Sequence, residues 1–187
     1  MNYYSRFPIK KTIRYLLFPV ILLSLSPVFT NLTKAFEFQW NPNNGFKQLR
    51  WYQRTAVKNS KNKIFLFFRP SDRKTGLLSI NIRLPDKFKS NLKPKNVTVC
   101  KANMGGYISR TKCLQDIPSD VVVNKDDKKL EIYPISPLPS DDDTYAIVFK
   151  LINPRRSGLY QFHSFGKSSG PVPVSNYIGS WTITIDP

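Results

Sequence analysis

Residues 153–186 read NPRRSGLYQFHSFGKSSGPVPVSNYIGSWTITID, a pattern that indicates two β-strands joined by a loop. Gly158 favours a turn because glycine tolerates positive φ. An aromatic-rich run from Leu159 to Phe165 then favours an extended strand. After a loop rich in glycine and proline, Ser180–Asp186 alternates between apolar and polar residues. The alternation predicts that one set of side chains faces a core, namely Trp181, Ile183 and Ile185.

Alternating apolar residues also predict strands upstream of this region. Thr144–Ile152 is apolar on both faces apart from Lys150, which favours a central strand. Val121–Asn124 and Leu130–Tyr133 are expected to pair as a hairpin. In Leu77–Leu84 one face should hold Leu78, Ile80, Ile82 and Leu84. Further strands are expected at Phe36–Trp40, Ile64–Arg69 and Asn96–Lys101, with a loop tip at Lys58–Lys63.

These patterns together predict an all-β fold. In the part that would be exported, helical periodicity does not persist over any window of about 11 residues, so short helical turns are expected only within 86–95 and 112–117. About eight short strands separated by turn signals are typical of an antiparallel β-sandwich, Ig-like or jelly-roll-like. A chain of 187 residues has room for one such domain, which we place at residues 36–187.

Residues 1–35 have the features of a secretory signal. Basic residues precede an apolar run from Tyr15 to Phe29, and Ala35 offers a small residue for cleavage. The run is shorter than the roughly 20 residues of a membrane-spanning helix, although an uncleaved anchor is the alternative. We therefore expect an exported protein that is periplasmic, envelope-associated or extracellular.

Two cysteines, Cys100 and Cys113, lie in the part of the chain that would be exported. In an oxidising compartment a disulfide is the default, and closing a loop of this length is worth about 3 kcal/mol. Two cysteines and the single His163 do not supply a four-ligand zinc site. We therefore expect a structural disulfide and neither a metal nor another cofactor.

Three short motifs carry a resemblance to a known family: Asn153-Pro154, Gly158-Leu-Tyr-Gln-Phe162 and Tyr177-Ile-Gly-Ser-Trp181. Together with the export signal they resemble the family called domain of unknown function 2808, whose members are mainly exported cyanobacterial proteins. The resemblance extends over the exported part in layout and is specific in its last quarter. It implies a secreted β-rich domain without an established activity, so no catalytic or binding residue is carried over.

A densely basic segment, residues 47–74, is the strongest functional signal in a chain of net charge +17. Nine basic residues stand against Asp72 alone, a local charge of +8, and aromatic residues lie between them. Cations interleaved with aromatic rings bind anionic polymers, although a merely soluble basic face is the alternative. The residues we expect to bind anions first are Lys58, Lys61, Lys63, Arg69 and Arg73.

The predicted function is therefore a non-catalytic envelope or extracellular domain that binds anionic polysaccharide or a membrane surface, with nucleic acid an unlikely partner for an exported chain. The alternative is a structural subunit that docks on another protein through a sheet edge. A hydrolase ranks last, because His163 is the single imidazole and no Gly-x-Ser-x-Gly motif precedes it. His163 is expected to be a hydrogen-bonded strand residue, and no catalytic residue is assigned.

Overall fold

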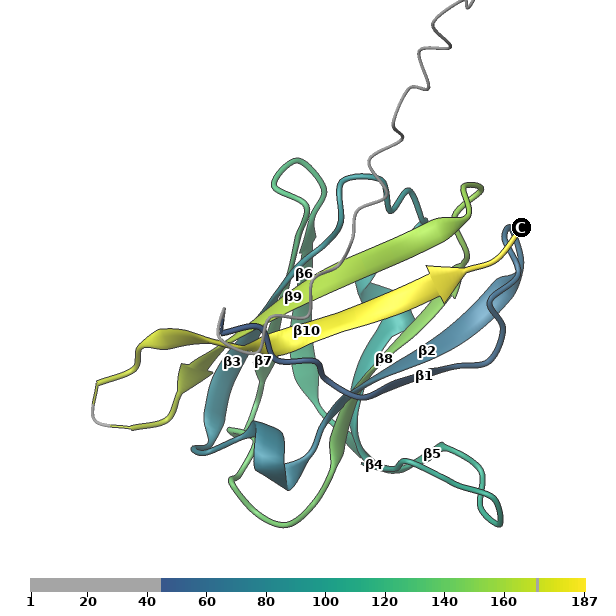
Figure 1. The fold of residues 1–187 in the computed structure, drawn as a ribbon. Coiled ribbons are helices and arrows are strands. Elements are labelled where there is room, and N and C mark those ends of the chain that lie inside the picture. The colour runs from purple at the N-terminus through teal and green to yellow at the C-terminus, as the bar shows by residue number, and fades with distance from the viewer. Residues whose placement is uncertain (1–44, 171) are drawn as a thin grey trace, which may run out of the picture. The chain divides into compact units, whose positions relative to one another are not determined.

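The computed structural model describes residues 45–170 and 172–187, which form two antiparallel five-stranded sheets (Figure 1). In spatial order, the first sheet comprises β1 (Trp51–Gln53), β2 (Lys61–Phe68), β8 (Tyr145–Ile152), β4 (Val97–Asn103) and β5 (Lys112–Ile117). The second comprises β10 (Ser175–Ile185), β9 (Gly158–Ser168), β3 (Leu77–Arg83), β7 (Lys129–Pro134) and β6 (Ser119–Asn124). Two short 3-10 turns span Pro70–Asp72 and Pro94–Asn96. The predicted all-β sandwich is confirmed.

Two predicted elements lie outside the described residues: the signal segment at 1–35 and the strand at Phe36–Trp40. Within the part that is described, no helix has both the length and the apolar character needed to cross a membrane.

The core between the sheets is built from the inward faces of the alternating strands. Trp181, Ile183 and Ile185 of β10 are buried in it, as their alternation predicts. The indole ring of Trp181 meets the ring of Phe68 edge-on, with centroids 5.1 Å apart, and its Nε1–H donates to the backbone carbonyl of Phe67 at 3.3 Å. The last strand of the chain is thereby joined to β2 of the opposite sheet.

The first sheet is apolar on both of its faces, and β8 shows why. β8 lies at the centre of that sheet, as its composition predicts, and Ile147 and Phe149 point into the main core. Its alternate residues Ala146 and Val148 belong to a second cluster. The other members of this second cluster are Phe65, Phe67, Cys100 and Ala102. The sheet therefore has an outer face with an apolar centre.

Three local predictions are wrong, each because strand pairing outweighs the local pattern. Residues 112–117 form the edge strand β5 rather than a turn, since they pair with β4. Lys61 begins β2, so the expected loop tip ends at Ser60. In β3 the register against β9 shifts between Leu77 and Ser79, and Leu77 joins the core in place of Leu78. A bulge of this kind cannot be read from alternation alone.

Candidate anion-binding cleft

Arg73 is one of the five cations expected to bind anions, yet its side chain is fully buried. Its guanidinium pairs with Asp141 at 3.3 Å and lies over the ring of Tyr145, 4.5 Å from the centroid. It also donates to the backbone carbonyls of Pro139 and Asp143. Arg73 therefore fastens the loop before β8 to the rest of the fold and presents no charge to a ligand.

Arg69 is also engaged within the protein. Its Nε lies 3.0 Å from a carboxylate oxygen of Asp72, and Nζ of Lys47 lies 3.0 Å from the other oxygen. The Asp72 side chain is buried beneath these two cations. Burial works against the charged carboxylate, but hydrogen bonds from Arg69 and Lys47 outweigh it and hold the pKa of Asp72 below its ordinary value.

The lowered pKa of Asp72 predicts a loss of stability in acid. Because the folded-state pKa lies below the unfolded value of about 3.9, ionised Asp72 stabilises the fold above that pH, and the contribution disappears as the pH falls through the folded-state pKa. We expect the free energy of unfolding of the wild type to decrease below about pH 4 more steeply than that of Asp72→Asn. Urea titrations followed by circular dichroism over a pH series measure both slopes. Equal slopes would contradict the prediction.

Lys61 and Lys63 have a different setting, on the outer face of the first sheet. Along β2, Ile64 and Leu66 enter the core, so Lys61 and Lys63 share the outer face with Phe65. The register places Lys63 directly opposite Lys150 of β8. Lys61 and Lys150 line a shallow hollow of about 280 Å³. Lys58, the remaining predicted site residue, is exposed in the turn before β2.

Beside Lys63 the outer face opens into a cleft of about 730 Å³, which we call the outer cleft. Phe65 is its buried floor, with Nζ of Lys63 4.8 Å from the ring centroid. The ring of Tyr52 lies 6.1 Å from that of Phe65 and is 44% exposed. Three cations line the cleft: Arg54, Lys63 and Arg110. Among the described residues, none of its lining side chains is acidic, and none of the three cations forms an ion pair.

A buried pair of amides positions the wall that carries Arg54. The Oδ1 atom of Asn62 accepts hydrogen bonds from the backbone N–H groups of Arg54 and Thr55, at 3.1 and 3.2 Å. Its Nδ2 donates to Oδ1 of Asn153 at 2.9 Å, and the Asn153 amide in turn donates to the carbonyls of Thr55 and Val57. The segment after β1 is therefore held from inside the protein, with the Arg54 side chain exposed.

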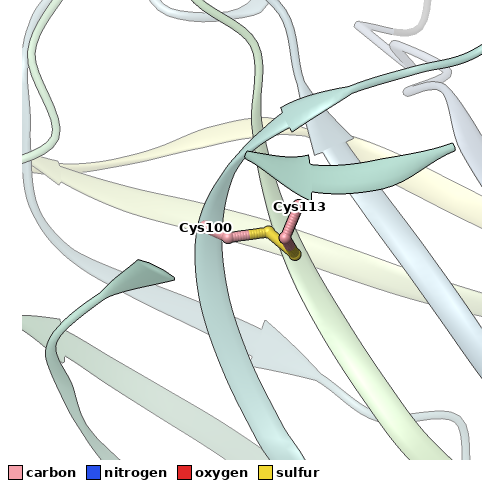
Figure 2. Close-up of a disulfide and its surroundings, with 2 residues drawn as sticks. All are labelled: Cys100 and Cys113. Carbon is pink, nitrogen blue, oxygen red and sulfur yellow. A yellow bond between two sulfur atoms is a disulfide. The ribbon is translucent and has the colours of Figure 1, made fainter. Parts of the chain in front are cut away.

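The opposite wall of the outer cleft is the hairpin between β4 and β5. Figure 2 shows the disulfide that joins these two strands, and its sulfur atoms are 2.04 Å apart, which confirms the predicted bond between Cys100 and Cys113. Asp116 lies close to both sulfurs, but sulfur atoms bonded to each other are not the thiolates that a metal site requires.

His163 lies on the second sheet, away from the lining of the outer cleft. Its Nδ1 is 2.8 Å from Oγ of Ser180, which is 2.7 Å from the hydroxyl of Tyr177. Burial, and to a smaller extent the charge of Arg83, lowers the pKa of His163. Ser180 is fully buried, so its hydroxyl is closed to a substrate. The prediction of a hydrogen-bonded strand histidine is confirmed.

The outer cleft thus retains one of the five cations named from the sequence, Lys63, and adds residues that sequence reasoning did not select. Arg54 and Tyr52 lie within the basic segment, so composition alone could have included them. Lys150, which pairs with Lys63 but lines the neighbouring hollow rather than the outer cleft, was signalled as the one charge in an otherwise apolar β8. Arg110 gave no signal, because only the folding back of the hairpin brings it beside β2.

The family model described as "Protein of unknown function (DUF2808)" matches residues 37–185. No curated protein matches in sequence. Among solved structures, the bacterial hydrophobin BslA is 14% identical, with 75% of this chain and 95% of that chain covered and a TM-score of 0.44. A collagen-binding domain from a Staphylococcus aureus adhesin is 13% identical, with 73% and 97% covered and a TM-score of 0.40. The collagen-binding subdomain ACE19 of an Enterococcus faecalis surface protein is 8% identical, with 74% and 97% covered and a TM-score of 0.42.

Proposed function

This chain belongs to the DUF2808 family of proteins of unknown function, and we propose that it is an exported, non-catalytic domain that binds anionic polysaccharide in the outer cleft. One observation supports the proposal above all: three cations and an aromatic floor line a single cleft, and within the described part of the chain these cations have no acidic partner. The predicted signal at residues 1–35 supports export, and an exported domain meets the acidic polymers of the cell envelope.

Uncompensated charge on this face favours a bound anion. Lys63 of β2 and Lys150 of β8 are directly opposite each other, and like charges in cross-strand pairs destabilise a sheet. Arg54 and Arg110 add positive charge from the two walls. A carboxylate, sulfate or phosphate in the outer cleft would relieve this repulsion and form charge-assisted hydrogen bonds. Among residues 45–170 and 172–187, no acidic side chain forms an ion pair that would remove this repulsion.

The shape and aromatic content of the outer cleft favour a polysaccharide over a flat surface. Its volume of about 730 Å³ falls in the range of ligand-binding sites, about 300–1,000 Å³. A bilayer surface cannot enter such a recess, whereas one or a few sugar rings can. The half-exposed ring of Tyr52 offers an apolar surface for the C–H face of a sugar, while the cations reach its acidic groups.

The test compares two triple variants that carry the same change in net charge. Arg54, Lys63 and Arg110 are replaced by glutamine in the cleft variant. The control replaces three exposed lysines outside the cleft, Lys89, Lys125 and Lys167. With alginate as the probe, calorimetry at low salt should show an affinity about tenfold lower for the cleft variant, since the three cations at about 0.2–1 kcal/mol each together contribute about 0.6–3 kcal/mol. The control should stay within about twofold of the wild type.

Salt and thermal unfolding complete this test. Alginate binding by the wild type should weaken as salt screens the charges, and the cleft variant should melt within a few degrees of the wild type because its three side chains are at the surface. An equal loss of alginate affinity in both triple variants would mean that alginate is attracted by net charge alone, and it would contradict a specific site in the outer cleft. Undetectable binding by the wild type at low salt would contradict the proposed function as a whole.

A further inference from the structure

The hairpin between β4 and β5 ends in a turn that projects from the sandwich (Figure 1). We call residues 104–111 the hairpin tip. Its outermost side chains, Tyr107 and Ile108, have exposed fractions of 110% and 103%, so neither packs against the rest of the protein. Met104, the first residue of the tip, and Leu114, on β5, are also exposed. Turn tips usually carry Gly, Pro, Asn, Asp or Ser, so two adjacent large apolar side chains are out of place in water.

The hairpin tip is built to hold these side chains outward. The N–H of Gly106 donates to the carbonyl of Ser109 at 2.8 Å, and the hydroxyl of Thr111 donates to the carbonyl of Met104 at 2.6 Å. Gly105 has a φ of +73°, and a Cβ there would lie 2.6 Å from the backbone nitrogen of Thr111. Together with the disulfide below, these contacts constrain the backbone of the tip, which lowers the ordering cost of inserting Tyr107 and Ile108.

Charge around the hairpin tip complements an anionic lipid surface. Arg110 and Lys112 are exposed just behind the apolar pair, and no acidic residue occurs between Ala102 and Leu114. Tyrosine and aliphatic side chains partition into the boundary between headgroups and acyl chains, while nearby lysine and arginine are attracted to anionic headgroups. The apolar side chains lie at the outermost point of the tip and the cations lie just behind them. This arrangement matches the order of acyl chains and anionic headgroups in a bilayer.

We propose that the hairpin tip inserts Tyr107 and Ile108 into the interfacial layer of an anionic bilayer, with Arg110 and Lys112 at the lipid phosphates. A protein partner is less suited to this surface. A stable interface buries about 800 Å² on each partner, whereas the tip offers two neighbouring side chains on a narrow projection. The insertion does not rest on the proposed function, because its apolar anchors Tyr107 and Ile108 do not line the outer cleft, although Arg110 is shared by the two surfaces.

Partitioning of the full chain onto vesicles tests the proposal. The vesicles contain equal parts of phosphatidylglycerol and phosphatidylcholine, and sedimentation measures the bound fraction. The tip variant carries Tyr107→Ser and Ile108→Ser, and the control carries Ile135→Ser and Val172→Ser, which are 74% and 72% exposed elsewhere. We expect the tip variant to partition about tenfold less strongly than the wild type, and the control to stay within about twofold. Equal partitioning of the tip variant and the wild type would overturn the proposal.

A local probe separates the hairpin tip from the apolar residues 15–29, which every variant retains. The variant Tyr107→Trp adds one tryptophan at the tip. Subtracting the wild-type tryptophan fluorescence from that of the variant isolates the emission of the tip. Anionic vesicles should shift this emission to the blue, and lipids with brominated acyl chains should quench it. An unshifted, unquenched emission would overturn the proposal. Alginate affinity tests the proposed function separately from membrane insertion. The tip variant should keep the alginate affinity of the wild type, because Tyr107 and Ile108 do not line the outer cleft.

Discussion

Replacing Trp181 with alanine is expected to lower the free energy of unfolding by about 3–5 kcal/mol, the usual cost of deleting a buried aromatic side chain. Trp181 is fully buried and is the largest side chain of the core. The substitution would remove the edge-on contact with Phe68 and leave the Phe67 carbonyl without its indole donor. Because these contacts join β10 to the opposite sheet, the two sheets would lose one of the contacts that hold them together.

Urea unfolding followed by circular dichroism measures the loss at Trp181. The matched control is Thr182→Ala, the next residue on the same strand, which faces away from the core and is half-buried. The control should cost less than about 1 kcal/mol. If both variants lost a similar free energy of unfolding, the two faces of β10 would contribute equally to stability. That result would contradict a core packed against the face that carries Trp181.

Removing the disulfide is expected to cost about 3 kcal/mol, from the chain entropy that the bond takes away in the unfolded state. The loss should be concentrated in the hairpin between β4 and β5. Strand β5 lies at the edge of its sheet, and most of its residues, Leu114 included, are exposed. Half-buried Cys113 packs against the outer apolar cluster through the bond to Cys100. Without the bond, β5 would retain little beyond its backbone pairing.

Two measurements distinguish the bond from the side chains that form it. Cys100→Ala combined with Cys113→Ala should lower the free energy of unfolding by about 3 kcal/mol, and reduction of the wild type should give a similar loss without changing side-chain volume. Hydrogen exchange should accelerate at the amides of β5 before those of β8. Protection of β5 that is unchanged on reduction would contradict this role. The same hairpin supplies Arg110 and one wall of the outer cleft, so this wall should also become less ordered when the disulfide is removed.

Predictions from alternation succeeded where a strand has one buried face or lies between two neighbours. β10 buries Trp181, Ile183 and Ile185 as expected, and the uninterrupted apolar pattern of β8 placed it at the centre of its sheet. β5 was missed because Lys112–Ile117 has almost no apolar periodicity and becomes a strand through pairing with β4. The functional site was harder to foresee. Basic composition pointed to residues 47–74, but composition does not tell a buried Arg73 from an exposed Arg54.

By itself, the sequence determined the fold class, most of the strands, the side of β10 that meets the core and the pairing of the two cysteines. Each of these follows from a local rule, since side chains alternate along a strand and two cysteines allow a single intrachain pairing. Only the tertiary structure decided which cations are free. Lys63 and Lys150 became opposite neighbours through strand pairing, and Arg73 entered an internal ion pair. Register and packing act between residues far apart in the chain, so local pattern does not encode which charges gather around one cleft.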